Sequence, residues 1–88
     1  MPYVSFFFGI IIRMFHDEHN PPHFHAEYQG QRGVFDFDGN LIHGKQRFKS
    51  KTAKRLIKEW ARLHKDALTA NWDRARLDGE IRKIDPLE

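Results

Sequence analysis

Residues 23–38 read HFHAEYQGQRGVFDFD, and this stretch predicts the β-hairpin on which the rest of the fold depends. In its first half, positions 24, 26 and 28 are apolar while positions 23, 25 and 27 are ionisable. Such alternation gives a strand one apolar face and one polar face. Phe35 and Phe37 repeat the apolar spacing in the second half, and Gln29-Gly30 is the predicted turn. The two apolar faces therefore belong on one core.

Two registers of this hairpin keep the apolar faces together. A two-residue turn places His23 opposite Asp36. A four-residue turn places His25 opposite Asp36 and His23 opposite Asp38. In both registers an imidazole lies beside a carboxylate on the face that points away from the core.

The remaining strands are predicted on either side of this hairpin. Residues 2–8 and 10–15 are rich in aromatic and β-branched residues around Gly9, which predicts two strands or one bent strand. Leu41-Ile42 between two turn signals is a candidate short edge strand. Ile81–Ile84, just before Asp85-Pro86, is a candidate last edge strand.

The C-terminal half has a helical pattern that begins after Ser50, a candidate N-cap. A single helix over residues 51–77 would be ~40 Å long at 1.5 Å per residue, which is more than so small a domain covers. We therefore predict a break near His64–Asp66 and two helices. The expected fold is α+β, a small antiparallel sheet from the N-terminal half packed against two helices from the C-terminal half, in a single domain over residues 1–88.

Composition limits the chemistry that this domain can perform. The chain has no cysteine, which excludes thiolate catalysis and cysteine-type zinc sites and suits a cytoplasmic location. Its longest apolar run, residues 6–12, is too short to span a bilayer, so we expect no membrane partner. Residues 1–44 contain two basic and five acidic side chains, whereas residues 45–88 contain thirteen basic and seven acidic ones. The positive half is suited to an anionic partner.

Four of the six histidines lie within residues 16–25, and two of them suggest acid–base catalysis. One histidine beside a carboxylate removes a proton from a ribose hydroxyl while another protonates the leaving oxygen, which is the minimum needed to cleave RNA. The candidate catalytic residues are His23, His25 and Asp36. Alternatively, the histidines serve structure by hydrogen bonding to the carbonyls of the Pro21-Pro22 turn.

The same strand face also suggests a metal site. The candidate ligands of Zn²⁺ or another divalent ion are His23, His25 and Glu27. The alternative is that a solvent-facing strand simply carries polar residues, because motif matches alone are weak evidence.

A second candidate surface is a helical stripe of cations, here called the basic stripe, which consists of Lys51, Arg55, Lys58, Arg62 and Lys65. Spacings of 4, 3, 4 and 3 residues place these side chains on one side of a helix. The stripe is a candidate nucleic-acid-binding surface, a surface for an acidic protein, or a solvated face. A catalytic site built from both regions requires the histidines and the stripe to meet in one cleft.

Several blocks of the sequence resemble one bacterial family. These are the Ser-x-Phe-Phe-Gly-Ile stretch at residues 5–10, the Asn-Pro-Pro-His-Phe-His-Ala-Glu-Tyr block at residues 20–28, Glu59-Trp60-Ala61, Asn71-Trp72 and the ending at residues 83–87. The family they resemble is domain of unknown function 4160. Its members are often paired with a small protein of domain of unknown function 2442, and the pair has been regarded as a toxin–antitoxin module.

The resemblance implies a toxin component with an antitoxin-like partner, and the residues suggest that it binds or cleaves RNA through the histidine face and the basic stripe. Such an enzyme would be a ribonuclease-like hydrolase. Two alternatives remain at this point, a noncatalytic regulator that binds nucleic acid or a partner protein, and a metal-dependent hydrolase.

Overall fold

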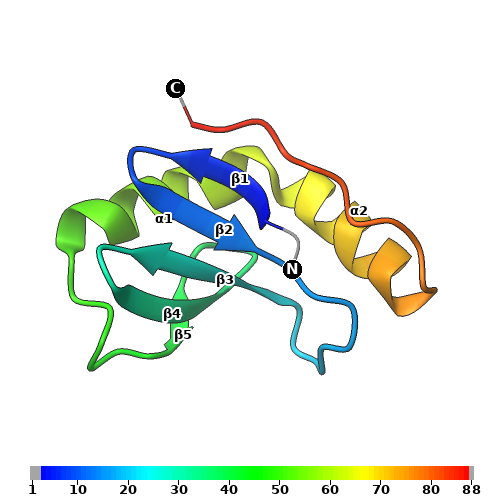
Figure 1. The fold of residues 1–88 in the computed structure, drawn as a ribbon, viewed down its shortest axis with the longest axis horizontal. Helices are drawn as coiled ribbons and strands as arrows, with labels where there is room; N and C mark the ends of the chain where they lie inside the picture. The colour runs from blue at the N-terminus through cyan, green and yellow to red at the C-terminus, as the bar shows by residue number, and fades with distance from the viewer. Residues whose placement is uncertain (1–2, 88) are drawn as a thin grey trace.

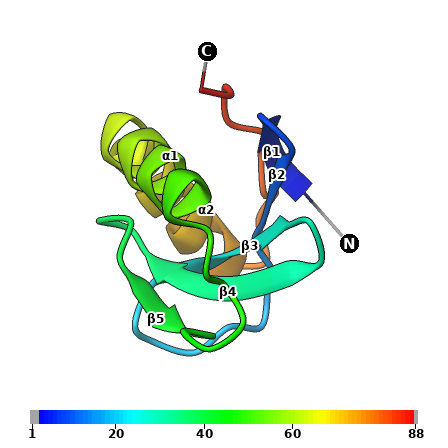
Figure 2. The ribbon, with the colours of Figure 1, turned by 90° about the vertical axis from the view of Figure 1, so that its left-hand side faces the viewer.

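A computed structural model describes residues 3–87 and confirms the α+β fold. Five strands precede two helices along the chain: β1 (Tyr3–Phe7), β2 (Ile10–Arg13), β3 (His23–Tyr28), β4 (Gln31–Asp36), β5 (Leu41–His43), α1 (Lys51–Leu63) and α2 (Lys65–Arg76). The strands form one antiparallel sheet in the order β1-β2-β3-β4-β5. Both helices cover the same face of this sheet (Figure 1, Figure 2). The other face is here called the outer face.

Tight turns fix the register of the sheet. Phe8 and Gly9 join β1 to β2 with φ of 50° and 80°, and Gln29 and Gly30 join β3 to β4 with φ of 48° and 79°. Positive φ at both central residues is typical of the type I′ turn, whose twist matches that of the flanking strands. The two-residue register is therefore the one that forms, and His23 pairs with Asp36.

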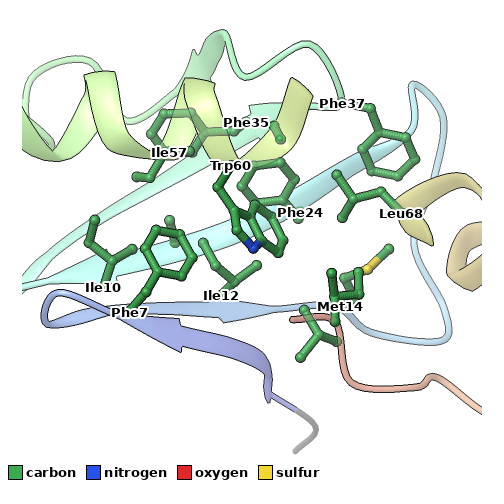
Figure 3. Close-up of a cluster of buried hydrophobic side chains, with 14 of the residues drawn as sticks. Phe7, Ile10, Ile12, Met14, Phe24, Phe35, Phe37, Ile57, Trp60 and Leu68 are labelled. Atoms are coloured by element: carbon green, nitrogen blue, oxygen red, sulfur yellow. The ribbon is translucent and has the colours of Figure 1, made fainter. Parts of the chain in front are cut away.

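The core lies between the sheet and the helices, with Trp60 of α1 at its centre (Figure 3). The Phe24 ring meets the Trp60 ring edge to face, with their centroids 5.5 Å apart, and stacks on Phe35 at 5.7 Å. Aromatic pairs of this kind add ~0.5–1.5 kcal/mol each to the free energy gained by burial. Phe24 and Ala26 are buried, so the inner face of β3 points toward α1.

The two helices end and begin where the sequence predicts. The Ser50 hydroxyl accepts a hydrogen bond from the backbone N–H of Ala53 at 3.1 Å and caps α1. His64 separates the helices, because it ends α1 and precedes α2. Among residues 3–87, neither helix has the length and apolar character needed to cross a membrane.

The predicted last edge strand in the C-terminal segment is wrong. Ile81–Ile84 is not a strand, although the segment runs beside β1 (Figure 1). Within residues 3–87, one backbone hydrogen bond joins this segment to β1, from the Ile84 N–H to the Val4 carbonyl. Side chains hold the rest: buried Asn71 donates to the carbonyl of Arg82 and accepts from its N–H. Side-chain anchors therefore replace the ladder of backbone bonds that a strand requires.

Candidate functional site on the outer face of the sheet

The outer face of β3 carries its ionisable residues. His25 and Glu27 alternate with buried Phe24 and Ala26, so their side chains point away from the helices. Both are half-buried rather than fully exposed. Contacts with neighbouring side chains therefore restrict the positions of the His25 and Glu27 side chains.

Glu18, His23 and His25 form a compact group, here called the histidine cluster. The Glu18 carboxylate lies between the two rings, with one oxygen 2.7 Å from His25 Nε2 and the other 3.1 Å from His23 Nε2. His23 Nδ1 donates to the Pro21 carbonyl at 2.7 Å. One carboxylate thus ties the loop at residues 14–22 to β3.

Aromatic side chains orient both imidazoles of the cluster. Phe15 meets the His25 ring edge to face with centroids 4.9 Å apart, and Trp72 meets the His23 ring at 5.4 Å. The two imidazoles lie 5.3 Å apart. Because Trp72 belongs to α2 and Phe15 to the loop, three parts of the chain fix the geometry of the cluster.

The surroundings of Glu18 alter its pKa in two opposing ways. Partial burial raises the pKa, whereas the hydrogen bond from His25 and the charges of His23 and His25 lower it. The lowering effects are larger together, so the pKa of Glu18 lies below its ordinary value. The cluster therefore contains a carboxylate that stays ionised beside two imidazoles.

His25 also borders a groove of about 800 Å³ on the outer face, here called the arginine groove. Its lining comes from β2, the start of the following loop, β3, β4, β5 and the turn after β5: Arg13, Phe15, His25, Ala26, Glu27, Arg32, Gly33, Val34, His43, Gly44 and Arg47. Arg13 Nε donates to Glu27 at 2.9 Å, so the one carboxylate of the lining is already paired. Three arginines and two histidines thus line one concavity.

Two predicted site residues lie outside the histidine cluster. Asp36 pairs with His23 in the backbone register, yet its carboxylate accepts hydrogen bonds from the backbone N–H groups of Asp38 and Asn40, which form the turn after β4. Glu27 belongs to the pair with Arg13. The carboxylate that the structure brings to both histidines is Glu18, which lies in the loop and not on the strand face.

The basic stripe lies across the molecule from the histidine cluster. Arg55, Lys58 and Arg62 are exposed on the side of α1 opposite its buried residues Ile57 and Trp60, and those buried residues face the sheet. A shallow depression lined by the stripe contains no residue of the outer face. Within residues 3–87, the two candidate surfaces therefore do not meet in one cleft. A catalytic site that uses both the histidines and the basic stripe is not formed in this part of the chain.

Two lysines of the stripe contact the loop after β4. Lys58 donates to Asn40 and Lys65 to Asp38, each at 2.7 Å. The hydrogen bond and charge of Lys65 lower the pKa of Asp38, and those of Asp38 raise the pKa of Lys65. Gly39 permits this close approach, because a Cβ there would lie 2.5 Å from the Lys58 Cα and its φ is +83°.

The outer face can support two kinds of chemistry. An imidazole held by an ionised carboxylate can exchange a proton with a bound substrate through its second nitrogen, as in acid–base catalysis. Two imidazole nitrogens and a carboxylate oxygen can also coordinate a metal ion. The arginines beside them can bind a phosphate group through two parallel hydrogen bonds.

Comparison with known proteins places this face within a family. The family model described as Domain of unknown function (DUF4160) matches residues 9–73, which include β3 and the whole histidine cluster. The comparisons with curated proteins and with solved structures give no match. Because the family model covers well over half of the 88 residues, the chain belongs to the family described as Domain of unknown function (DUF4160).

Proposed function

We propose that the chain is the RNA-binding toxin component of a bacterial two-gene module, acts in the cytoplasm and binds single-stranded RNA in the arginine groove. The observation that carries this proposal is that the His25 ring lines the same groove as Arg32 and Arg47. A phosphodiester bound by these arginines would lie beside an imidazole that is already held by a carboxylate. Its cognate partner would be an antitoxin-like protein resembling domain of unknown function 2442.

The charge of the groove supports an anionic ligand. Arg13 is paired with Glu27, whereas residues 3–87 provide no carboxylate within 4.0 Å of Arg32 or Arg47. A guanidinium presents donors in a fixed fork that matches two oxygens of a phosphate. Since both arginines are exposed, they are free to bind such a group.

The shape of the groove supports a short single strand. A volume of about 800 Å³ is within the ~300–1,000 Å³ range of sites that enclose small ligands. A concavity of this volume offers room for a few nucleotides of a single strand. Phe15 and His25 in its lining provide ring faces and edges against which an unstacked base can pack.

The test compares charge reversal on the two cationic surfaces. Fluorescence anisotropy with a labelled single-stranded RNA measures binding by the parent, by Arg32→Glu/Arg47→Glu and by Arg55→Glu/Arg62→Glu. All four positions are exposed, so both variants should fold, which circular dichroism checks. We expect the groove variant to lose binding and the matched helix variant to retain it, because the proposed site is the groove and not α1. Retained binding in the groove variant would contradict the proposal.

A second candidate function is a noncatalytic nucleic-acid-binding regulator. One observation favours it: both ring nitrogens of His23 already contact protein acceptors, Pro21 and Glu18, as expected of a residue that fixes a loop. The two candidates differ in whether the RNA is cut. Gel analysis of RNA incubated with the purified protein separates them, because a regulator leaves its length unchanged.

A further inference from the structure

We propose that Glu18, His23 and His25 form a binding site for one divalent transition-metal ion, coordinated by His23 Nε2, His25 Nε2 and a Glu18 carboxylate oxygen. This proposal does not depend on RNA binding. It also differs from the ligand set that the strand pattern suggests, because Glu18 of the loop replaces Glu27.

The spacing of the three donor groups fits a metal. One ligand atom from each residue lies within 4.8 Å of the other two. Around a tetrahedral ion with ligands at ~2.0–2.1 Å, neighbouring ligand atoms are ~3.3–3.4 Å apart. The carboxylate oxygens lie 2.7 and 3.1 Å from the two Nε2 atoms, which is the separation of a hydrogen bond. When an ion takes the place of these contacts, the two carboxylate–imidazole separations would lengthen by about 0.2–0.7 Å.

The hydrogen bond from His23 to the Pro21 carbonyl is the second observation that favours a metal. Because a carbonyl only accepts, His23 Nδ1 carries the proton of this hydrogen bond. In the neutral ring the lone pair is then on Nε2, the atom that faces Glu18. Metal-binding histidines usually donate their other N–H to a backbone carbonyl or a carboxylate in this way, which fixes both tautomer and ring orientation.

The packing around the cluster holds the ligands in place before an ion binds. Phe15 and Trp72 contact the two imidazoles edge to face, and β3 sets the spacing between His23 and His25. The His23 side chain is 11% exposed and the Glu18 side chain 24% exposed, so an ion could reach the cluster. Little side-chain entropy remains to be lost on binding.

The donor types indicate which metals the site selects. Two imidazoles and one carboxylate suit Zn²⁺, Co²⁺, Ni²⁺ or Fe²⁺, whereas Mg²⁺ and Ca²⁺ prefer oxygen ligands alone. Three protein ligands leave at least one position for water, as in catalytic rather than structural zinc sites. A water bound at that position would lie close to the wall of the arginine groove that His25 forms.

Calorimetric titration of the full chain with ZnCl₂ at pH 7.5 tests the site, and Co²⁺ absorption spectroscopy reports the coordination geometry. We expect one ion per chain and the visible absorption of tetrahedral or five-coordinate Co²⁺. Mg²⁺ should give no measurable heat of binding. Absence of stoichiometric Zn²⁺ binding by the parent protein would overturn the proposal without any variant.

Variants identify the ligands. His25→Ala and Glu18→Gln should each weaken Zn²⁺ binding by more than the ~10–100-fold that loss of an outer-sphere partner costs. The matched controls are His43→Ala and Glu27→Gln, which alter a histidine and a glutamate of the arginine groove outside the cluster and should leave the affinity unchanged. Unaltered binding in His25→Ala, or equal loss in His43→Ala, would assign the ion to another site. Because the readout is metal affinity, failure of this proposal is distinguishable from failure of RNA binding.

Discussion

The outer face of the sheet and the exposed side of α1 are both cationic, but they are assembled in different ways. The arginine groove takes its side chains from four strands and two connecting segments and encloses about 800 Å³. The basic stripe comes from one short segment of the chain, and the depression beside it is smaller, at about 460 Å³. The lining of each depression includes three Lys or Arg side chains and one glutamate, so the net charge of these residues does not distinguish the two surfaces.

The difference between them lies in shape and in neighbouring chemistry. The larger groove, built from several strands, removes water from a bound phosphate on more sides and strengthens each charge interaction more than the smaller depression along one helix does. The groove also adjoins the histidine cluster, and the stripe adjoins the loop at residues 38–40, which already engages Lys58 and Lys65. A concentration of positive charge in the sequence is therefore a weaker guide to function than the surface on which the charges meet.

The largest expected effect comes from the inner side of β3, which supports both surfaces. Phe24→Ala removes a fully buried ring that contacts Phe35 and Trp60, and such a deletion typically costs ~3–5 kcal/mol. A domain of this size has little stability to spare. We expect thermal unfolding, followed by circular dichroism, to show a strongly lowered midpoint, together with loss of every activity of both surfaces.

His25→Ala is the matched change on the outer side of the same strand. It leaves no core cavity, because His25 points away from the helices, and Glu18 keeps its contact with His23, so the variant should melt much closer to the parent than Phe24→Ala does. If the chain is the toxin proposed above and acts through the outer face, expression of the parent should inhibit growth and expression of this variant should not. A variant that folds normally and stays fully toxic would favour α1 or a partner-binding surface.

The features that the sequence predicted correctly are those set by local patterns of residues. The hairpin, the cap at Ser50 and the break at His64 follow from local patterns, and the structure confirms them. Glu18 was missed as a partner of the histidines because it lies in a loop, where strand alternation gives no guidance. Its only signal was its position within residues 16–25, the histidine-rich segment.

The arginine groove could not be predicted from local patterns. Arg13, Arg32 and Arg47 are separated by 19 and 15 positions along the chain and have no shared periodicity. Only the antiparallel pairing of β2 with β3, β3 with β4, and β4 with β5 places them around one concavity. The basic stripe, in contrast, was visible at once because helical spacing is local.

An effect of intermediate size is expected in the salt dependence of RNA binding, which compares the arginine groove with the basic stripe. Each phosphate contact to single-stranded RNA contributes about 0.7 to the slope of log K against log salt concentration. We expect Arg32→Ala to reduce the magnitude of this slope by about one such contact, while Arg55→Ala, its exposed counterpart on α1, leaves the slope unchanged. The measurement is a series of anisotropy titrations at increasing KCl. If only Arg55→Ala changed the slope, the RNA-binding surface would be α1 and not the groove.

The smallest expected effect concerns the exposed ion pair between Asp38 and Lys65, which links the stripe to the loop after β4. The hydrogen bond from Lys65 lowers the pKa of Asp38 below its ordinary 3.8, so the stability it contributes is present above about pH 4 and is lost as the pH falls through the lower folded value. The pKa of Lys65 is raised above 10.5, so its contribution is present below that pH and is lost as the pH rises through the higher folded value.

The pair should therefore stabilise the fold slightly across the neutral range and not at either extreme. Urea unfolding of the parent and of Asp38→Asn, between pH 2 and pH 7, should give curves that differ at neutral pH and converge in acid. Asp73→Asn on α2 is the control, since that exposed carboxylate forms no ion pair within residues 3–87. Added salt should reduce the difference at pH 7, because water and ions screen an exposed pair. A difference that persists unchanged at pH 2 would mean that Asp38 acts through the turn at Gly39 and not through its charge.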